Sequence, residues 1–182
     1  MAQGVKKKRT EVGVNWFDDK SVHEVSCVEN RFVAKHNLSD KKFYVQYAGT
    51  VGFVVDYKMV IEVAKLLANY KNTVFQTIGM ESQREEFENE VKENKLNNIV
   101  FLPLESQEMV SVVYSACSVC LIPLKHGIIG NSVPSKAGLL MQCKRPIVTS
   151  ADENSVYSKE YNIGIACPND NPDKITEAIL HL

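Results

Sequence analysis

The sequence predicts an α/β fold, a doubly wound and mostly parallel six-stranded sheet with helices on both faces. Two observations support this prediction. Between residues 43 and 182, short apolar runs alternate with segments of helical period. The links between them are short, and such alternation is typical of parallel strands that are covered by helices on both faces. A sheet of this kind binds ligands at the carboxyl ends of its strands.

Six short runs have the composition of strands, being rich in β-branched and aromatic residues. The expected strands cover residues 43–48, 73–78, 98–102, 118–122, 146–149 and 162–167. The first stops at Gly49, the second at Gly79 and the third at Pro103, all residues that interrupt strands. The fourth is almost entirely apolar, as expected for a strand covered on both faces.

Helices are expected between these strands, at residues 57–70, 82–95, from 106 onward, 135–142 and 171–182. The first has an apolar face, and the second is polar except for Phe87 and Val91, which indicates an exposed helix. In the third, which begins at Ser106, residues 109, 110, 113 and 114 supply the apolar stripe. Asn171-Pro172 opens the last helix, with proline at the first helical position, and this helix is still amphipathic at Leu182.

The first 42 residues do not follow the alternation. We interpret residues 1–42 as an entry segment, with a polar loop from Asp18 to Glu29, and residues 43–182 as one domain whose final helix is cut short. The chain of 182 residues has the length of a single domain. Its end partway through a helix suggests that it was excised from a longer protein.

Composition excludes several classes of protein. There are 21 Lys and Arg against 22 Asp and Glu, a net charge of −1, which argues against a chain-wide electrostatic grip on nucleic acid. No apolar run approaches the roughly 20 residues that span a bilayer. The five cysteines lie mostly in apolar runs, which favours thiols in a cytoplasmic protein. Cys117 and Cys120 have the spacing of a redox or zinc motif but lack a second pair, which favours packing.

Two segments are candidates for phosphate binding. The turn from Gly49 to Gly52 could present backbone N–H groups to a diphosphate, or it could be an ordinary strand-to-helix turn. Ser135 and Lys136 open a helix whose first amides favour an anion. N-capping by Ser135 would explain the serine but not the lysine. Lys136 could instead pair with a carboxylate of the next loop, such as Asp152.

The loop after residue 122 supplies further candidates. Lys125 and His126 follow a buried strand, where phosphate or sugar contacts are favoured, although loop lysines are usually only solvated. Asn131 could hydrogen-bond a sugar hydroxyl or simply serve a turn. The basic run at residues 6–9 is either a solvated end or a weak contact with anionic lipid. No Ser-His-Asp, Cys-His or paired-carboxylate arrangement can be assembled.

Four segments, taken in order, resemble the C-terminal, donor-binding half of retaining glycosyltransferases of the GT-B fold, in the bacterial capsule and O-antigen group 1 family. They are Asn15–Asp18, Tyr47–Gly52, Asn98–Pro103 with Tyr114–Ala116, and Val133–Lys136 with Pro146–Ser150. The resemblance implies a Rossmann-like domain that binds a nucleotide diphosphate sugar, UDP-linked, for transfer to a glycan or lipid-linked acceptor. It implies donor contacts from Gly49, Thr50, Gly52, Lys125, His126, Asn131, Ser132, Ser135 and Lys136.

The resemblance also implies what lies outside this chain. The acceptor site and any acid/base residue would belong to the absent N-terminal half, so the isolated domain is expected to be inactive. No metal is expected, since no Asp-x-Asp motif is present to hold Mg²⁺, and neither a cofactor nor a nucleic-acid partner is implied. The full-length enzyme is expected in the cytoplasm, with a peripheral contact to the inner face of the membrane.

Some family residues are missing. The two signature glutamates correspond to Asn131 and Leu139, and an Arg/Lys pair around the glycine loop corresponds to Thr50 and Asp56, with Lys58 nearby. These departures support an alternative from another functional class, a non-catalytic sugar-nucleotide-binding subunit that works with a catalytic partner.

Overall fold

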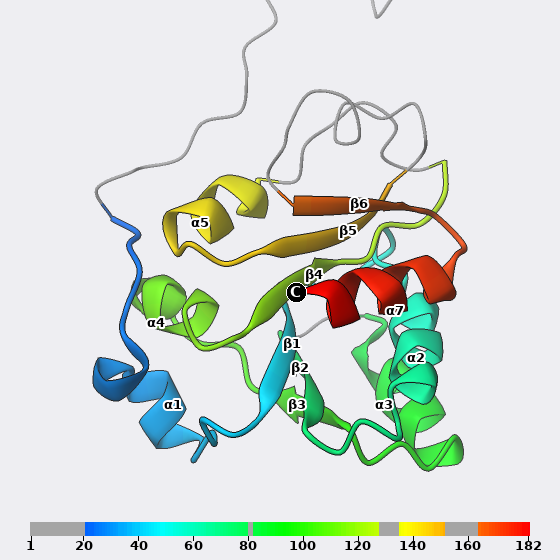
Figure 1. The fold of residues 1–182 in the computed structure, drawn as a ribbon, viewed down its shortest axis with the longest axis horizontal. Coiled ribbons are helices and arrows are strands. Elements are labelled where there is room, and N and C mark those ends of the chain that lie inside the picture. The colour runs from blue at the N-terminus through cyan, green and yellow to red at the C-terminus, as the bar shows by residue number, and fades with distance from the viewer. Residues whose placement is uncertain (1–20, 80–81, 128–134, 152–163) are drawn as a thin grey trace, which may run out of the picture.

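The computed structural model describes residues 21–79, 82–127, 135–151 and 164–182. Its six strands form one sheet in the order β3-β2-β1-β4-β5-β6, and every neighbouring pair is parallel (Figure 1). The strands are β1 (Phe43–Ala48), β2 (Thr73–Ile78), β3 (Ile99–Leu102), β4 (Val119–Ile122), β5 (Ile147–Ala151) and β6 (Gly164–Pro168). The predicted fold class is therefore confirmed, and β1 and β2 have the predicted bounds.

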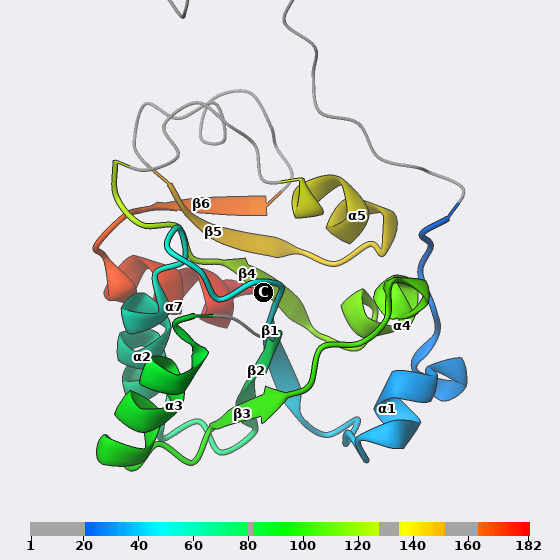
Figure 2. The ribbon, with the colours of Figure 1, turned by 180° about the vertical axis from the view of Figure 1, so that it is seen from behind.

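Helices cover both faces of this sheet (Figures 1 and 2). One face carries α2 (Tyr57–Leu66), α3 (Arg84–Glu93) and α7 (Pro172–His181). The other carries α4 (Val110–Tyr114) and α5 (Lys136–Gln142). Pro172 is the first residue of α7, and the Asn171 side chain accepts a hydrogen bond from the Lys174 N–H, as expected for a cap.

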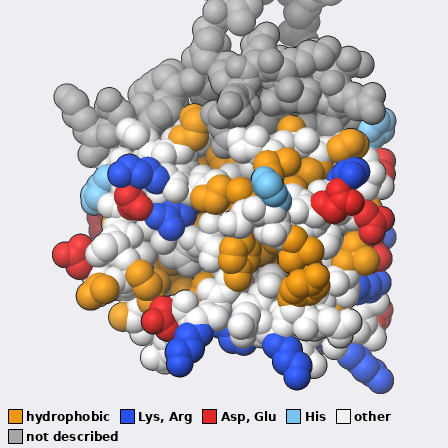
Figure 3. Space-filling model, viewed as in Figure 1, with side chains coloured by type: hydrophobic (Ala, Val, Ile, Leu, Met, Phe, Trp, Pro, Cys, Tyr) orange, Lys and Arg blue, Asp and Glu red, His pale blue; other side chains and the backbone are white. Residues whose placement is uncertain are grey.

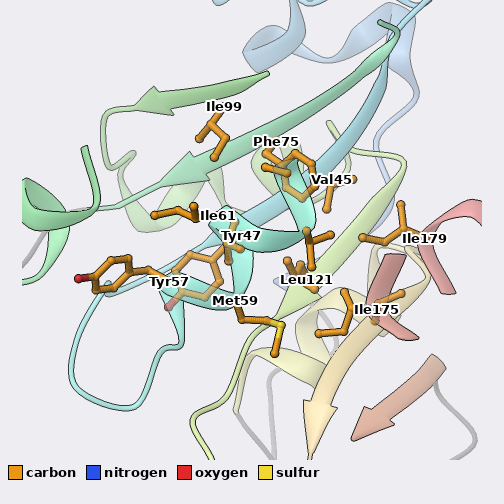
Figure 4. Packing of buried hydrophobic residues seen from close by; sticks show 14 of the residues in the cluster. Val45, Tyr47, Tyr57, Met59, Ile61, Phe75, Ile99, Leu121, Ile175 and Ile179 are labelled. Atoms are coloured by element: carbon orange, nitrogen blue, oxygen red, sulfur yellow. The ribbon is translucent and has the colours of Figure 1, made fainter. Parts of the chain in front are cut away.

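The larger part of the core lies between the sheet and the first of these layers. Figure 4 shows side chains of the sheet and of the helices that cover it pointing toward one another, among them Val45 of β1, Phe75 of β2, Leu121 of β4 and Ile175 of α7. All four are at most 2% exposed. Alternate residues of each strand face this cluster, which explains why the strand sequences had to be apolar at these positions.

The segment before β1 is more structured than the sequence predicted. Cys27–Glu29 form a 3-10 turn, η2, so the expected polar loop over 18–29 is wrong at its end. A helix that was not predicted, α1 (Arg31–Lys35), follows. The Asn30 side chain caps α1 by accepting the Phe32 and Val33 N–H groups, and it also donates to the Val112 carbonyl of α4 at 2.8 Å. The entry segment therefore packs on α4.

This packing changes the helix that was predicted from Ser106. It is divided into a 3-10 turn, η3 (Gln107–Met109), and the short α4. Its buried residues are Ser111, Val112 and Val113, whereas Met109 and Val110 are only partly covered. Of the predicted stripe, Val113 is buried and Met109 and Tyr114 are partly buried against the same cluster, whereas Val112 is buried without having been predicted. Likewise α2 ends at Leu66 rather than Tyr70.

The surface is mixed in charge. Figure 3 shows acidic and basic side chains spread over one face, with Lys and Arg most frequent along its lower edge. In the described ranges, no helix combines the length and apolar character needed to cross a bilayer.

Candidate active site

The candidate site lies at the carboxyl ends of β1 and β4, in the middle of the sheet. β1 has β2 on one side and β4 on the other, so the strand order reverses between β1 and β4. The chain leaves β1 for α2 on one face and leaves β4 for α5 on the other (Figure 2). Such a reversal opens a crevice at the strand ends, where open α/β sheets bind their ligands.

Gly49 ends β1 in a backbone conformation that favours glycine, with φ of +146°. A Cβ atom there would lie 2.7 Å from the Lys136 ammonium nitrogen. The Gly49 N–H donates to the Ile78 carbonyl at 2.8 Å, so this amide is used by the sheet rather than offered to a ligand. Gly49 therefore contributes space at the strand end, not the hydrogen-bond donor that the sequence suggested.

The rest of the glycine loop returns along the exit of β4. Val55 and Leu124 form an antiparallel bridge, the Asp56 N–H donates to the Pro123 carbonyl at 3.0 Å, and the Lys125 N–H donates to the Val54 carbonyl at 3.1 Å. We call this contact between residues 54–56 and 123–125 the loop bridge. The Ser150 hydroxyl holds the loop bridge in place by accepting the Leu124 N–H and donating to the Leu124 carbonyl.

Lys136 reaches over the end of β1 from the first turn of α5. Its ammonium donates to the Ala48 carbonyl at 3.1 Å and lies 4.2 Å from the centre of the Tyr47 ring. Burial lowers the pKa of this lysine to about 8, because desolvation disfavours the charged form. Among the described residues, no carboxylate pairs with it. An anion bound at this point would stabilise the ammonium.

Two hollows adjoin the contact between Lys136 and Gly49. One, of about 210 Å³, is on the β4 side and is lined by Tyr47, Val54, Val55, Ile122, Pro123, Leu124, Ser135 and Lys136. The other, of about 90 Å³, is on the β2 side and is lined by Ala48, Gly49, Ile78, Leu104, Glu105, Ser106, Val110, Val113 and Tyr114. Lys136 thus lines the first of these mainly apolar recesses, and Gly49, which its ammonium contacts, lines the second.

A model of one protein family, described as "Glycosyl transferases group 1", matches residues 28–182. The chain belongs to this family. It is 26% identical over 171 residues to the "Probable glycosyltransferase WbjE" of Pseudomonas aeruginosa, a match that covers 91% of this chain and 42% of that protein.

Two solved structures show that the group 1 domain has the fold of known glycosyltransferases. WaaG, a glycosyltransferase involved in lipopolysaccharide biosynthesis, is 14% identical with a TM-score of 0.76, over 98% of this chain and 48% of WaaG. Alr3699/HepE of Anabaena, solved in complex with UDP and glucose, is 14% identical with a TM-score of 0.72, over 98% and 48%. The chain spans about half the length of these relatives.

The structure brings two predicted site residues of this group 1 domain together, since a Cβ atom at Gly49 would lie 2.7 Å from the Lys136 ammonium nitrogen. Ser135 and Lys136 line one hollow and Gly49 the other. Gly52 is buried and its carbonyl accepts the Val55 N–H, which shapes the loop. Thr50 is exposed, and its carbonyl accepts the Tyr47 hydroxyl.

The other predicted residues line neither hollow or lie outside the described ranges. Lys125 stacks on Phe53, with 5.2 Å between its ammonium and the ring centre, and it lines neither hollow. His126 is exposed. Asn131, Ser132, the basic run at 6–9 and the proposed partner Asp152 lie outside the described residues. Ser135 makes no capping hydrogen bond within the described structure, so the N-cap alternative does not explain it.

Asp56 and Leu139 both depart from the family pattern, and Asp56 has a structural role. Asp56, at a position where the resemblance leads us to expect a basic residue, caps α2 by accepting the Met59 N–H at 3.0 Å. Lys58 lies 3.9 Å from Glu90 of α3 and is therefore drawn toward that helix. Leu139, at a glutamate position, is a partly covered residue of α5.

Tyr47 is a residue of the candidate site that sequence reasoning did not single out. Its ring lies under the Lys136 ammonium, and its hydroxyl holds the Thr50 carbonyl. In the sequence it is one of several aromatic residues of a strand, and only its place next to the glycine turn could have singled it out.

The cysteines form no metal site among the described residues, where no group of three or more metal-ligating side chains occurs. Cys117 and Cys120 are buried thiols with 3.3 Å between their sulfur atoms. The shared hydrogen bond and burial raise the pKa of Cys120 well above its usual range. These thiols are packing residues beneath the site.

Proposed function

We propose that this chain is the donor-binding half of a retaining glycosyltransferase, which transfers a sugar from a nucleotide diphosphate sugar, UDP-linked, to a glycan or lipid-linked acceptor. The observation that carries the proposal is Lys136, a desolvated ammonium placed over a glycine at the point where the strand order reverses. The UDP found with Alr3699/HepE supports the choice of nucleotide.

In this proposal the diphosphate lies against Gly49, where no side chain intervenes, and against the Lys136 ammonium. Cleavage of the sugar–phosphate bond leaves negative charge on the diphosphate. A positioned ammonium in a partly desolvated site stabilises that charge without reorganisation. The small apolar hollow beside Gly49, with Tyr114 in its wall, is suited to the planar base, and the larger hollow on the β4 side leaves room for the sugar.

The acceptor and any acid/base residue come from the other half of the protein in this proposal. We place the reaction in the cytoplasm, at the inner face of the membrane. The five cysteines are all free thiols, which is typical of cytoplasmic proteins. We propose that transfer needs no metal, since the sequence lacks an Asp-x-Asp motif. Transfer by the full-length enzyme should then continue in excess chelator, and its abolition would contradict this part.

Calorimetry with the full-length protein tests the proposal. UDP and UDP-sugars should bind, with GDP and ADP as matched nucleotides that differ only in the base. No detectable binding of any of these at millimolar ligand would overturn the donor site, and preferential binding of GDP or ADP would overturn the choice of UDP.

One observation favours the non-catalytic alternative. Asp56 caps a helix at a position where a basic, phosphate-binding residue is expected. This alternative predicts that UDP-sugar binds tightly but is neither hydrolysed nor transferred by the full-length protein. Product formation from a labelled UDP-sugar and a lipid-linked acceptor would exclude it.

A further inference from the structure

We propose that Arg84, on the far side of β2, is a positioning residue for the donor site, and that it acts through Gly79 on the glycine loop. The expected effect on donor binding rests on the proposed function, whereas the contacts from which we argue are all within this chain. They form a continuous path from α3 to Gly49 and Lys136.

The first step is the grip of Arg84 on two strand ends. One nitrogen of its guanidinium donates to the carbonyl of Gly79, just after β2, and to that of Leu102, the last residue of β3, the latter at 3.0 Å. Another nitrogen pairs with Glu88 at 2.7 Å, and the group lies 5.4 Å from the centre of the Phe101 ring. The side chain is 19% exposed. Arg84 is therefore held in one orientation and ties β2 to β3.

The second step is the contact between Gly79 and Gly49. Gly79 has φ of +146°, and a Cβ atom there would lie 2.0 Å from the Gly49 carbonyl oxygen. The two backbones thus touch, and the Gly49 N–H also donates to Ile78, the neighbour of Gly79. At the start of α3, the Gln83 N–H donates to the Val51 carbonyl at 3.3 Å. The residues around Arg84 therefore contact the glycine loop at two points.

The third step joins the loop to the ammonium. Lys136 lies against Gly49 and donates to the preceding carbonyl, that of Ala48. A displacement of the Gly49 peptide would therefore change both the space for a diphosphate and the hydrogen bond of Lys136. Misplacement of a binding group by about 1 Å costs up to about a hundredfold in rate, so a small movement at Gly79 is enough to be measured.

Arg84→Lys is the direct test, in the full-length protein. Lysine keeps the charge but presents a point donor, which cannot reproduce the planar fork that serves two carbonyls and Glu88 together. We expect UDP to bind about tenfold more weakly. Glu88→Gln is the matched control, since it removes the ion pair and leaves both carbonyl contacts of Arg84, and it should bind UDP as the wild type does.

A purely structural role is separated by a second measurement without nucleotide. The titration of Lys136, followed by NMR of ¹³C-methylated lysines and assigned with Lys136→Met, should shift its midpoint in Arg84→Lys and not in Glu88→Gln. Gly79→Ala reaches the same loop from the other end of the path and should shift the same resonance. A loss of thermal stability with both the UDP affinity and this titration unchanged would overturn the inference.

The outcomes keep the two proposals apart. If the wild type binds no nucleotide, the proposed function fails, and the Lys136 titration still decides whether Arg84 positions the loop. If the wild type binds UDP and Arg84→Lys binds it equally well, the positioning role is wrong and the donor site stands.

Discussion

At the scale of single residues, Lys136 combines two unfavourable features that an anion would relieve. Its ammonium is partly desolvated, and it lies in the first turn of α5, where cations are disfavoured by the helix dipole. The only described polar partner of its charge is the Ala48 carbonyl. A residue kept in this setting is a strong candidate for contact with a phosphate.

We expect Lys136→Ala to weaken UDP binding by about ten- to a hundredfold, because a charge-assisted hydrogen bond contributes roughly 1.5–3 kcal/mol. Calorimetry on the full-length protein measures this. Lys58→Ala is the control, since that lysine is exposed and lies toward Glu90. Equal affinity of Lys136→Ala and wild type would refute the phosphate role.

The affinity for UDP should also depend on pH. The Lys136 pKa of about 8 means that its charge is lost as the pH rises through that value, and anion binding should weaken over the same range. Stability should behave oppositely. Between about pH 8 and 10.5, the unfolded chain binds more protons than the folded one, so the free energy of unfolding rises with pH. Both trends should vanish in Lys136→Met, and their persistence there would assign them to another group.

At the scale of elements, the segment before β1 is part of the folded domain. Phe32 of α1 is fully buried against α4, and the His23 and Val25 N–H groups donate to the hydroxyls of Ser111 and Ser115. The stability of the short α4 therefore depends on residues that come before the first strand in the sequence. Its own five residues could not form a stable helix alone.

Phe32→Ala should lower the free energy of unfolding by about 3–5 kcal/mol, the usual cost of removing a buried phenyl ring. Urea denaturation gives the value. Val28→Ala is the control, because Val28 is 98% exposed and its loss should cost less than about 0.5 kcal/mol. Similar midpoints for the two variants would mean that α1 is not part of the cooperative unit.

Sequence patterns were sufficient where local signals agree with burial. β1 and β2 stop at glycines that the strand ends require, and the Asn171-Pro172 signal begins α7 as predicted. The patterns missed α1 and gave α4 only as part of a longer helix, because five-residue helices offer too few turns for their own periodicity to appear. Both helices are stabilised by the hydrogen bond between Asn30 and Val112, which are about 80 positions apart. A local sequence pattern holds no information on such a contact.

The same limit applied to the site. Lys136 was predicted from its position after a glycine-containing loop, whereas Tyr47 and Arg84 were not, since each acts through contacts that only the folded sheet creates. Conversely, the Gly49 amide looked available in the sequence and is occupied by β2 in the structure. The sequence identified the carboxyl ends of the strands as the place where a ligand would bind. Tertiary contacts determine which groups at these strand ends remain accessible to it.

At the scale of the whole molecule, the five cysteines should report on its integrity. Cys27 is exposed, and the other four are buried. Burial raises the pKa of Cys143 and Cys167, as the hydrogen bond with Cys117 and burial do for Cys120, so their reactive thiolates are scarce. Ellman's reagent should modify one thiol rapidly in the native protein and five in denaturant. Rapid reaction of more than one native thiol would contradict the packing beneath the site.

The loop bridge has a consequence for how a ligand arrives and leaves. Because residues 54–56 are paired with 123–125 through backbone hydrogen bonds of the chain itself, we expect this side of the crevice to need no folding step on encounter. Association rates should then be similar among variants that keep the bridge, and differences in their affinity should appear in the lifetime of the complex. Stopped-flow measurements with a fluorescent UDP analogue should show nearly the same association rate for Lys136→Ala and the wild type. Dissociation should be faster in Lys136→Ala.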